Sequence, residues 1–313
     1  MIVTVTLNPS LDEWVYLPAL RLGDLNRAIR FVRYPGGKGI NVARVIHELG
    51  QRTLAVALAG GSDGKILSHL LTTQYQIPHR FVTVAGSTRN NYQIQTGSPR
   101  TITQINCPGP VVSRTSLHEL TRILRHLGHR ASCVVLSGSL PPGAPTTTYR
   151  RVLTMLRPLQ VPTVLDTSGP ALRDGLLARP WLIKPNRQEV EELLGRRLRG
   201  IAQVAQAAKH LVKRGPSVVI VSLGPEGAVL ASQGQAQVLW AKPPRVPVDS
   251  PVGAGDSLIA GFVVGYQATR VLPEALRLGV ACGAACALTP GTELCYRKDV
   301  RRLVDRVRLR VLP

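Results

Sequence analysis

Acidic and aromatic residues are both scarce in this chain. Its 18 Asp and Glu residues stand against 39 Lys and Arg residues, which gives a formal net charge of +21, and a surface of one sign attracts anions. The 3 Phe, 3 Trp and 7 Tyr residues do not interleave with basic runs as base-stacking surfaces require. The basic segment 297–310 has the apolar spacing of an amphipathic helix with a solvated charged face. Specific nucleic-acid binding is therefore not the expected function, in spite of the charge.

Cysteine and long apolar runs are scarce as well. The five cysteines are odd in number and contain no Cys-x-x-Cys motif, which predicts reduced thiols and a cytoplasmic protein. Cys282 and Cys286 share a helix face but have no His or carboxylate beside them, so we expect core residues and not metal ligands. No run of about 18 apolar residues occurs, and the first residues do not resemble a secretory signal, so neither a membrane span nor an export leader is expected.

The chain does have a regular alternation of strands and helices after about residue 131. With 313 residues and 44% hydrophobic content, it can bury a large core. Short apolar runs end in Ser, Asp or Lys before a Gly or Pro turn, at residues 133–137, 163–166, 181–184 and 218–222. This pattern predicts an α/β fold with a mostly parallel sheet covered by helices on both faces. Ligands then bind beyond the carboxyl ends of the strands.

The first third of the chain follows a different pattern. Residues 28–34, 91–96 and 101–105 alternate partly between apolar and polar side chains, as strands with one wet face do. Together with the segment after Asp12, they predict a small antiparallel sheet, a lid formed from about residues 12–35 and 88–107. Such a sheet leaves an apolar face uncovered, so it must close over a ligand, pack on a partner, or do both.

The most informative motif is the segment 249–265, where Asp256 follows the glycine-rich turn of Gly253 and Gly255. The glycines let the backbone approach a ligand closely, and the free N–H groups at a helix start favour phosphoryl oxygens. A carboxylate cannot itself bind phosphate in such a cradle. Asp256 is therefore a candidate general base for an attacking hydroxyl, although a single first-turn Asp can also serve the helix dipole alone.

Residues 36–39, Gly-Gly-Lys-Gly, open a second helix in which Lys38 and Asn41 lie one turn apart. Glycines around a lysine before a helix are typical of an anion site. The motif is not a Walker loop, and the nearest match at 59–66 lacks both the first glycine and the Ser or Thr that binds magnesium.

The segment after residue 183 has two interpretations. Asn186 with Glu189 three residues later is typical of a capping box. Alternatively, Glu189 holds water on a divalent cation that carries nucleotide phosphates. The segments 137–143, 166–169 and 222–227 are turns when taken singly, but all of them lie at the same predicted edge of the sheet.

Taken in order, these segments resemble the ribokinase-like (PfkB) sugar kinases, and within them the hexose-phosphate branch. The resemblance covers nearly the whole chain, which is thus expected to form one kinase domain, 1–313, with a β lid. Each motif alone is weak, but the ordered set is specific. The matching segments are residues 4–12, 36–44, 88–90, 137–141, 165–169, 183–186 with Glu189, 222–227 and 252–257.

The resemblance implies phosphorylation of a sugar-phosphate hydroxyl by ATP with Mg²⁺. Asp256 is the base in this scheme, and the backbone of Gly253, Ala254 and Gly255 holds the migrating phosphoryl group. The implied substrate-binding residues are Asp12, Gly37, Lys38, Asn41, Arg89 and Ser139, in which Asp12 and Asn41 bind hydroxyls and Lys38 and Arg89 bind the substrate's phosphate. The implied ATP-binding residues are Lys184, Asn186, Ser222, Gly224 and Gly227, with Glu189 near the metal through water. A homodimer through the lid is expected.

The family narrows the substrate without fixing it. We expect fructose 1-phosphate, converted to fructose 1,6-bisphosphate, with tagatose 6-phosphate or fructose 6-phosphate as the alternatives. A kinase for a free sugar or nucleoside is opposed by the two cations Lys38 and Arg89, and a nucleic-acid-binding protein on a kinase scaffold by the intact motif at 253–256. Asp249 stands where phosphofructokinase relatives often have Asn, and residues 286–293 do not clearly reproduce the family's monovalent-cation loop, so potassium activation is left open.

Overall fold

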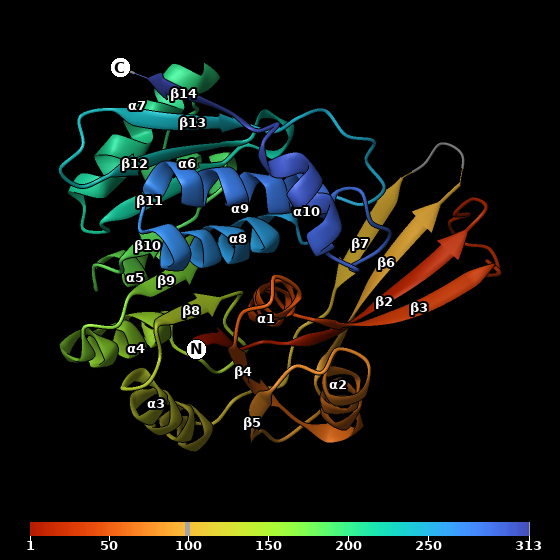
Figure 1. Cartoon of the computed structure of the whole chain (residues 1–313). Coiled ribbons are helices and arrows are strands. Elements are labelled where there is room, and N and C mark those ends of the chain that lie inside the picture. The colour runs from red at the N-terminus through yellow and green to blue at the C-terminus, as the bar shows by residue number, and fades with distance from the viewer. Residues whose placement is uncertain (98–100, 313) are drawn as a thin grey trace.

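Seven parallel strands form the larger part of a ten-stranded sheet in the computed structural model, which describes residues 1–97 and 101–312. Three antiparallel strands extend this sheet at one edge (Figure 1). The strand order is β14 (Arg308–Leu312), β13 (Val238–Lys242), β12 (Ala228–Ser232), β11 (Val218–Ser222), β10 (Leu182–Ile183), β9 (Thr163–Asp166), β8 (Cys133–Ser137), β1 (Ile2–Thr6), β4 (Thr53–Ala59) and β5 (His79–Thr83). The predicted mostly parallel sheet is confirmed.

Helices cover both faces of this sheet (Figure 1). One face packs against α3 (Arg114–Gly128), α4 (Thr148–Leu156), α5 (Gly169–Leu176), α6 (Arg187–Leu194) and α7 (Gly200–Lys213). The other face packs against α1 (Lys38–Glu48), α2 (Gly61–Thr73), α8 (Ala254–Thr269), α9 (Leu272–Cys286) and α10 (Arg297–Val304).

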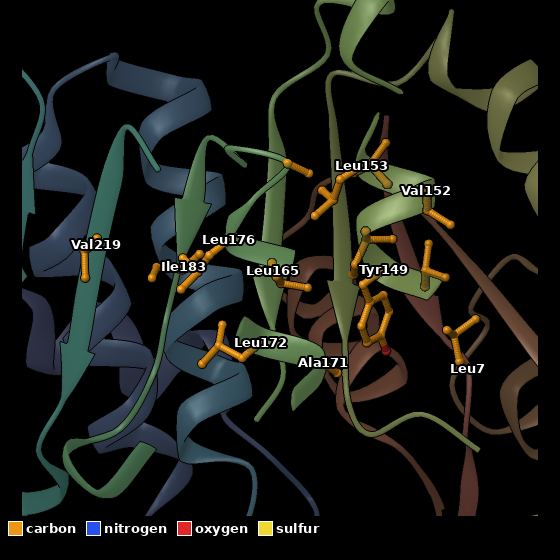
Figure 2. Packing of buried hydrophobic residues seen from close by; sticks show 14 of the residues in the cluster. Leu7, Tyr149, Val152, Leu153, Leu165, Ala171, Leu172, Leu176, Ile183 and Val219 are labelled. Carbon is orange, nitrogen blue, oxygen red and sulfur yellow. The ribbon is translucent and has the colours of Figure 1, made fainter. Parts of the chain in front are cut away.

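The strands are apolar on both faces because each face has its own core. In β11, Val219 and Val221 belong to one hydrophobic cluster, whereas Val218 and Ile220 belong to the other. Figure 2 shows the first cluster, with residues of α4 and α5 packed on the strands. This alternation explains why the sequence reads as continuous apolar runs with no period of two.

A separate four-stranded sheet projects from the body (Figure 1). Its order is β3 (Arg30–Gly36), β2 (Ser10–Leu17), β6 (Arg89–Thr96) and β7 (Ile102–Asn106). The expectation that it is antiparallel was wrong at its centre, where β2 pairs with β6 in parallel. Both strands leave the body, β2 after β1 and β6 after β5, so they run in the same direction. Residues 98–100 of the predicted lid range 88–107 lie outside the described residues.

The C-terminal segment also differs from expectation. The helix predicted over residues 297–310 ends at Val304, and Arg308–Leu312 pairs antiparallel with β13 as β14. Residues 308–311, Arg-Leu-Arg-Val, alternate between charged and apolar side chains, a period of two that suits a strand. Basic side chains on that edge also discourage pairing with a further strand.

All five cysteines are free thiols, as expected. No helix in the described part of the chain is both long enough and apolar enough to cross a membrane.

Glycines set the close packing of α8 against α9. A Cβ on Gly261 would lie 2.9 Å from the carbonyl oxygen of Leu278, and a Cβ on Gly279 would lie 2.7 Å from that of Leu258. Each glycine therefore faces the backbone of the opposite helix. Because α8 carries Asp256 in its first turn, this contact fixes the position of the candidate base.

Replacing Gly279 by Ala should destabilise the protein, because overpacking of this kind costs about 1–3 kcal/mol. Gly283→Ala is the matched control, because Gly283 lies in the same helix and the change brings the same gain in helix propensity. A Cβ on Gly283 would lie 3.2 Å from its nearest atom, the carbonyl oxygen of Ala254. Denaturant titration of both variants compares their free energies of unfolding. Equal values for the two variants would show that the helix contact relaxes freely.

Candidate active site

The carboxyl edge of the large sheet opens into a cavity of about 530 Å³. The cavity lies between this edge, the first turns of α1 and α8, and the inner face of the small sheet. Its walls are mostly polar, and its lining residues are Ser10, Asp12, Gly37, Lys38, Asn41, Arg89, Asn91, Gln93, Gln104, Asn106, Lys184, Asn186, Glu189, Ser222, Pro251, Val252, Gly253, Gly255 and Asp256.

Most of the residues singled out from the sequence meet in this cavity. Ala254 is the first residue of α8, beside the lining residues Gly253 and Gly255. Three others do not line the cavity. Ser139 is exposed and accepts a 3.2 Å hydrogen bond from Nδ2 of Asn8, while Gly224 and Gly227 bound the short turn between β11 and β12.

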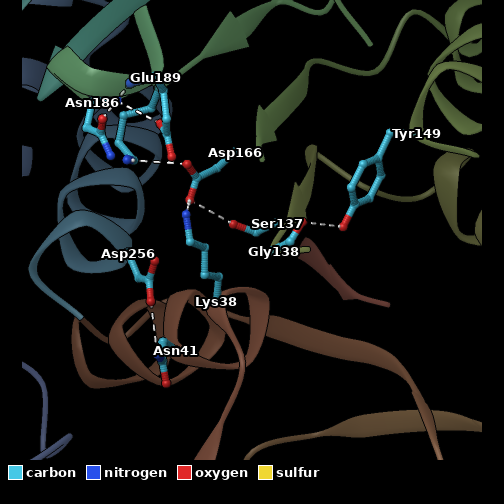
Figure 3. Close-up of polar contacts among 10 residues, drawn as sticks. Lys38, Asn41, Ser137, Gly138, Tyr149, Asp166, Asn186, Glu189 and Asp256 are labelled. Atoms are coloured by element: carbon cyan, nitrogen blue, oxygen red, sulfur yellow. Dashed lines mark hydrogen bonds and ion pairs between the residues drawn. The ribbon is translucent and has the colours of Figure 1, made fainter. Parts of the chain in front are cut away.

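Asp256 is buried in the first turn of α8, only 6% exposed. Gly253 before it has a φ of 86°, a conformation that favours glycine. The side-chain amide of Asn41 donates a 2.9 Å hydrogen bond to Oδ2 of Asp256 (Figure 3). Burial raises the pKa of Asp256 to about 6, although the ammonium group of Lys38 opposes the shift. A carboxylate with that pKa is ionised at neutral pH and basic enough to accept a proton.

An ion triad lies beside Asp256, in which Asp166 and Lys184 are buried and the Lys38 side chain is 41% exposed. Asp166, at the end of β9, is 3.4 Å from Nζ of Lys38 (Figure 3). It is also 3.3 Å from Nζ of Lys184. The hydroxyl of Ser137 donates a 3.2 Å hydrogen bond to the same carboxylate. Burial alone would raise the pKa of Asp166, but Lys184 and Lys38 outweigh it and hold the pKa below its usual value. The pKa of Lys38 is raised, chiefly by Asp166.

Sequence reasoning missed the role of Asp166, whose segment was interpreted as a turn. The signal was present, because Ser137, Asp166 and Lys184 stand at the carboxyl ends of the neighbouring strands β8, β9 and β10. Side chains at one edge of a parallel sheet meet there.

Asp12 forms the opposite wall, on β2. Oδ1 of this carboxylate accepts hydrogen bonds from Ser10 at 2.8 Å and from Nδ2 of Asn91 at 3.3 Å. Burial raises the pKa of Asp12, against the effects of these hydrogen bonds and of Arg89. A side chain at Gly36 would overlap the Asp12 carboxylate, so a glycine is required here for packing.

Arg89 lies at the base of the small sheet and lines the cavity. Its guanidinium donates hydrogen bonds to the carbonyl oxygens of Cys107 at 3.1 Å and Asn8 at 3.0 Å. Burial lowers the pKa of Arg89, with Asp12 opposing. The side chain therefore presents a positive charge to the cavity from a fixed position.

The capping box predicted at the start of α6 is present. Oδ1 of Asn186 accepts from the amide of Glu189, and Oε2 of Glu189 accepts from the amide of Asn186, both at 2.8 Å. Both side chains nonetheless line the cavity, and Asn186 forms a parallel bridge with Ser222. The capping contacts therefore hold Glu189 at the cavity wall, and the two interpretations of this segment are compatible.

The described residues contain no group of three His, Cys, Asp or Glu side chains placed to bind a metal. Mg²⁺ does not require such a group, because it is commonly held by one or two carboxylates together with waters and substrate phosphates. Glu189 is the carboxylate of the cavity that lies beside Lys184 and Asn186.

Comparison with known proteins gives a consistent result. Residues 5–299 match the pfkB family carbohydrate kinase model. The chain is 35% identical over 309 residues to 1-phosphofructokinase of Bacillus subtilis, covering 99% of both chains. It is 37% identical over 305 residues to ATP-dependent 6-phosphofructokinase isozyme 2 of Mycobacterium tuberculosis, covering 97% of this chain and 89% of that protein.

The fold agrees with these relationships. The structure of phosphofructokinase-2 from Escherichia coli in complex with potassium has a TM-score of 0.92 and 32% identity, covering 97% of this chain and 98% of that one. The ribokinase-like fold expected from the sequence is therefore confirmed. The match over residues 5–299 shows that this chain belongs to the pfkB family of carbohydrate kinases.

Proposed function

We propose that this protein transfers the γ-phosphoryl group of ATP to a hydroxyl of a hexose monophosphate. The preferred substrate in this proposal is fructose 1-phosphate, and the product is fructose 1,6-bisphosphate. The observation that carries the proposal is a buried carboxylate, Asp256, placed among the first amides of α8 in a cavity that also holds Lys38, Arg89 and Lys184. A base, an anion cradle and separate cations are the parts that phosphoryl transfer requires.

In this proposal the acceptor hydroxyl lies between Asp12, Asn41 and Asp256. Asp256 removes its proton as the oxygen attacks phosphorus, and the bond to the leaving ADP oxygen breaks. Asn41 keeps the base in position through its 2.9 Å hydrogen bond. The backbone amides of residues 253–255 and the ammonium group of Lys184 stabilise the negative charge on the transferred group.

Arg89 and Lys38 are proposed to bind the phosphate that the sugar already carries. Fructofuranose has a near two-fold symmetry that exchanges C1 with C6, so one arrangement of cations and base accepts either monophosphate. The relatives named 1-phosphofructokinase and 6-phosphofructokinase are consistent with this relation. Fructose 6-phosphate and tagatose 6-phosphate are therefore the alternative substrates.

ATP is proposed to lie along Lys184, Asn186 and Ser222, with the turn of Gly224 and Gly227 beyond them. Mg²⁺ bound to its phosphates would neutralise charge in the transition state. Glu189 is the residue that would hold this ion, through water. The remaining expectations are also proposals: the chain forms one kinase domain with the small sheet as its lid, and the free thiols fit a cytoplasmic protein.

A coupled ADP-release assay on four sugars tests the substrate. We expect kcat/KM to be highest for fructose 1-phosphate, followed by fructose 6-phosphate or tagatose 6-phosphate, with free fructose far below. A buried polar group left unpaired by the wrong sugar costs about 1–3 kcal/mol, or one to two orders of magnitude in kcat/KM. Free fructose matching the phosphorylated sugars would refute the roles of Lys38 and Arg89.

The pH dependence tests the base. Protonation of Asp256 removes the base, so kcat/KM should fall about tenfold per pH unit below the pKa of about 6. In Asp256→Asn the new side chain can still accept the hydrogen bond from Asn41, but it cannot accept a proton. We expect kcat near neutral pH to fall at least about a hundredfold in this variant.

The same variant also controls for ionisation of the substrate, because the phosphate of a sugar phosphate has a pKa of about 6. A falling limb that persists unchanged in Asp256→Asn comes from the substrate. Near-normal turnover in that variant would remove Asp256 from the mechanism.

The outer face of the small sheet supports a homodimer. Phe31, Tyr92 and Ile105 on this face are 53%, 39% and 47% exposed, and Tyr92 lies directly opposite Ile105 in the strand register. An apolar patch on a projecting sheet marks an interaction surface. A two-fold axis would bury the patch against its copy.

Light scattering at micromolar concentration should therefore give twice the mass of one chain. Ile105→Lys should shift the protein toward the monomer, because it places a charge in the buried contact. Leu177→Lys is the matched control, since Leu177 is 62% exposed at the end of α5. A wild-type monomer, or equal mass changes in both variants, would refute the dimer.

A further inference from the structure

The inner face of the small sheet carries two pairs of amide side chains. Asn91 on β6 lies opposite Asn106 on β7, and Gln93 lies opposite Gln104. All four line the cavity. We refer to these four residues as the amide ladder. They had no role in the sequence-based scheme.

The two pairs differ in how their polar atoms are used. Asn91 is fully engaged within the protein, because Nδ2 donates to Asp12 at 3.3 Å and Oδ1 accepts from the amide of Cys107 at 3.2 Å. Its role is to orient Asp12. Gln93 is only 4% exposed, and its Oε1 atom has no hydrogen-bond partner among the described residues.

An unpartnered carbonyl oxygen at such a buried position is unfavourable unless a ligand supplies a donor. Gln93 also lines the cavity, so a ligand bound there is the nearest source of such a donor. A fully ionised phosphate cannot supply this donor, since its oxygens only accept. A sugar hydroxyl fits, because it can donate.

Arg89 is the cation that this sheet face contributes to the cavity. Arg89 lies on the same strand, four residues nearer the body, opposite Ser10. Successive residues rise about 3.3 Å along a strand, so the two Cα atoms are separated by about 13 Å. The charged and the neutral ends of the sheet face can therefore contact different parts of one phosphorylated sugar.

We propose that Oε1 of Gln93 accepts a hydrogen bond from one ring hydroxyl of the sugar phosphate, with Gln104 beside it, and that this contact determines specificity among hexose phosphates. This inference rests on the proposed function and adds a specificity-determining residue to it.

The test is a double-mutant cycle between the side chain and the sugar. Wild type and Gln93→Leu are assayed with fructose 1-phosphate and with analogues that lack the hydroxyl at C2, C3 or C4. For one analogue, wild type should lose at least about tenfold in kcat/KM, whereas Gln93→Leu should show little further loss. The KM for ATP should stay unchanged in the variant.

Two further variants separate recognition from structure. Gln93→Glu keeps an oxygen acceptor and should still discriminate against the same analogue, even with weaker overall binding. Thr103→Val on β7 does not line the cavity and should behave as wild type, which controls for changes to the sheet.

The outcomes are distinct. If discrimination is equal in wild type and Gln93→Leu for every analogue, Gln93 does not read a hydroxyl and the inference is wrong. If Gln93→Leu does not fold, the Gln93→Glu variant decides the question. Loss of its discrimination against the deoxy analogue would then show that the inference is wrong. If wild type phosphorylates no sugar phosphate at all, the proposed function itself fails.

Discussion

The buried carboxylate of Asp166 is the interaction on which the site depends. It forms ion pairs with Lys38, the first residue of α1, and with Lys184, which follows β10. These contacts join the edge of the large sheet to α1, the helix that follows strand β3 of the small sheet. Loss of one partner from a buried ion pair costs about 3–5 kcal/mol. Without Asp166, two ammonium groups would repel each other at the centre of the cavity, and α1 would lose its link to the sheet edge.

The triad also influences the protonation state of Asp256, the proposed base. Burial and the charge of Asp166 raise the pKa of Asp256, while Lys38, Lys184 and the amide of Asn41 lower it. Phosphoryl groups entering the cavity add negative charge and would raise this pKa further. The two lysines therefore help to keep Asp256 ionised at neutral pH, in addition to the phosphate-binding roles proposed for them.

The strands of the large sheet were predictable because each one combines an apolar run with a polar residue at its end, as in residues 133–137 and 163–166. The motifs at 36–39 and 253–256 likewise located the cavity. Long-range pairing was not predictable, since nothing local specifies that β2 and β6 run parallel or that Arg308–Leu312 joins β13. Asp166 was missed although its position at a strand end was recognised, because its segment was interpreted as a turn and its ion pair with Lys38 joins segments distant in sequence.

The small sheet connects substrate recognition with assembly. On β6, Asn91 and Gln93 face the cavity, whereas Tyr92 faces outward beside Ile105. Because side chains alternate along a strand, a register slip of one residue would move the amides out of the cavity and the aromatic ring into it. Burial of the outer face in a dimer would penalise that slip. The contact between subunits would then hold Gln93 and Asp12 in the register that the sugar requires, although neither residue lies on the outer face.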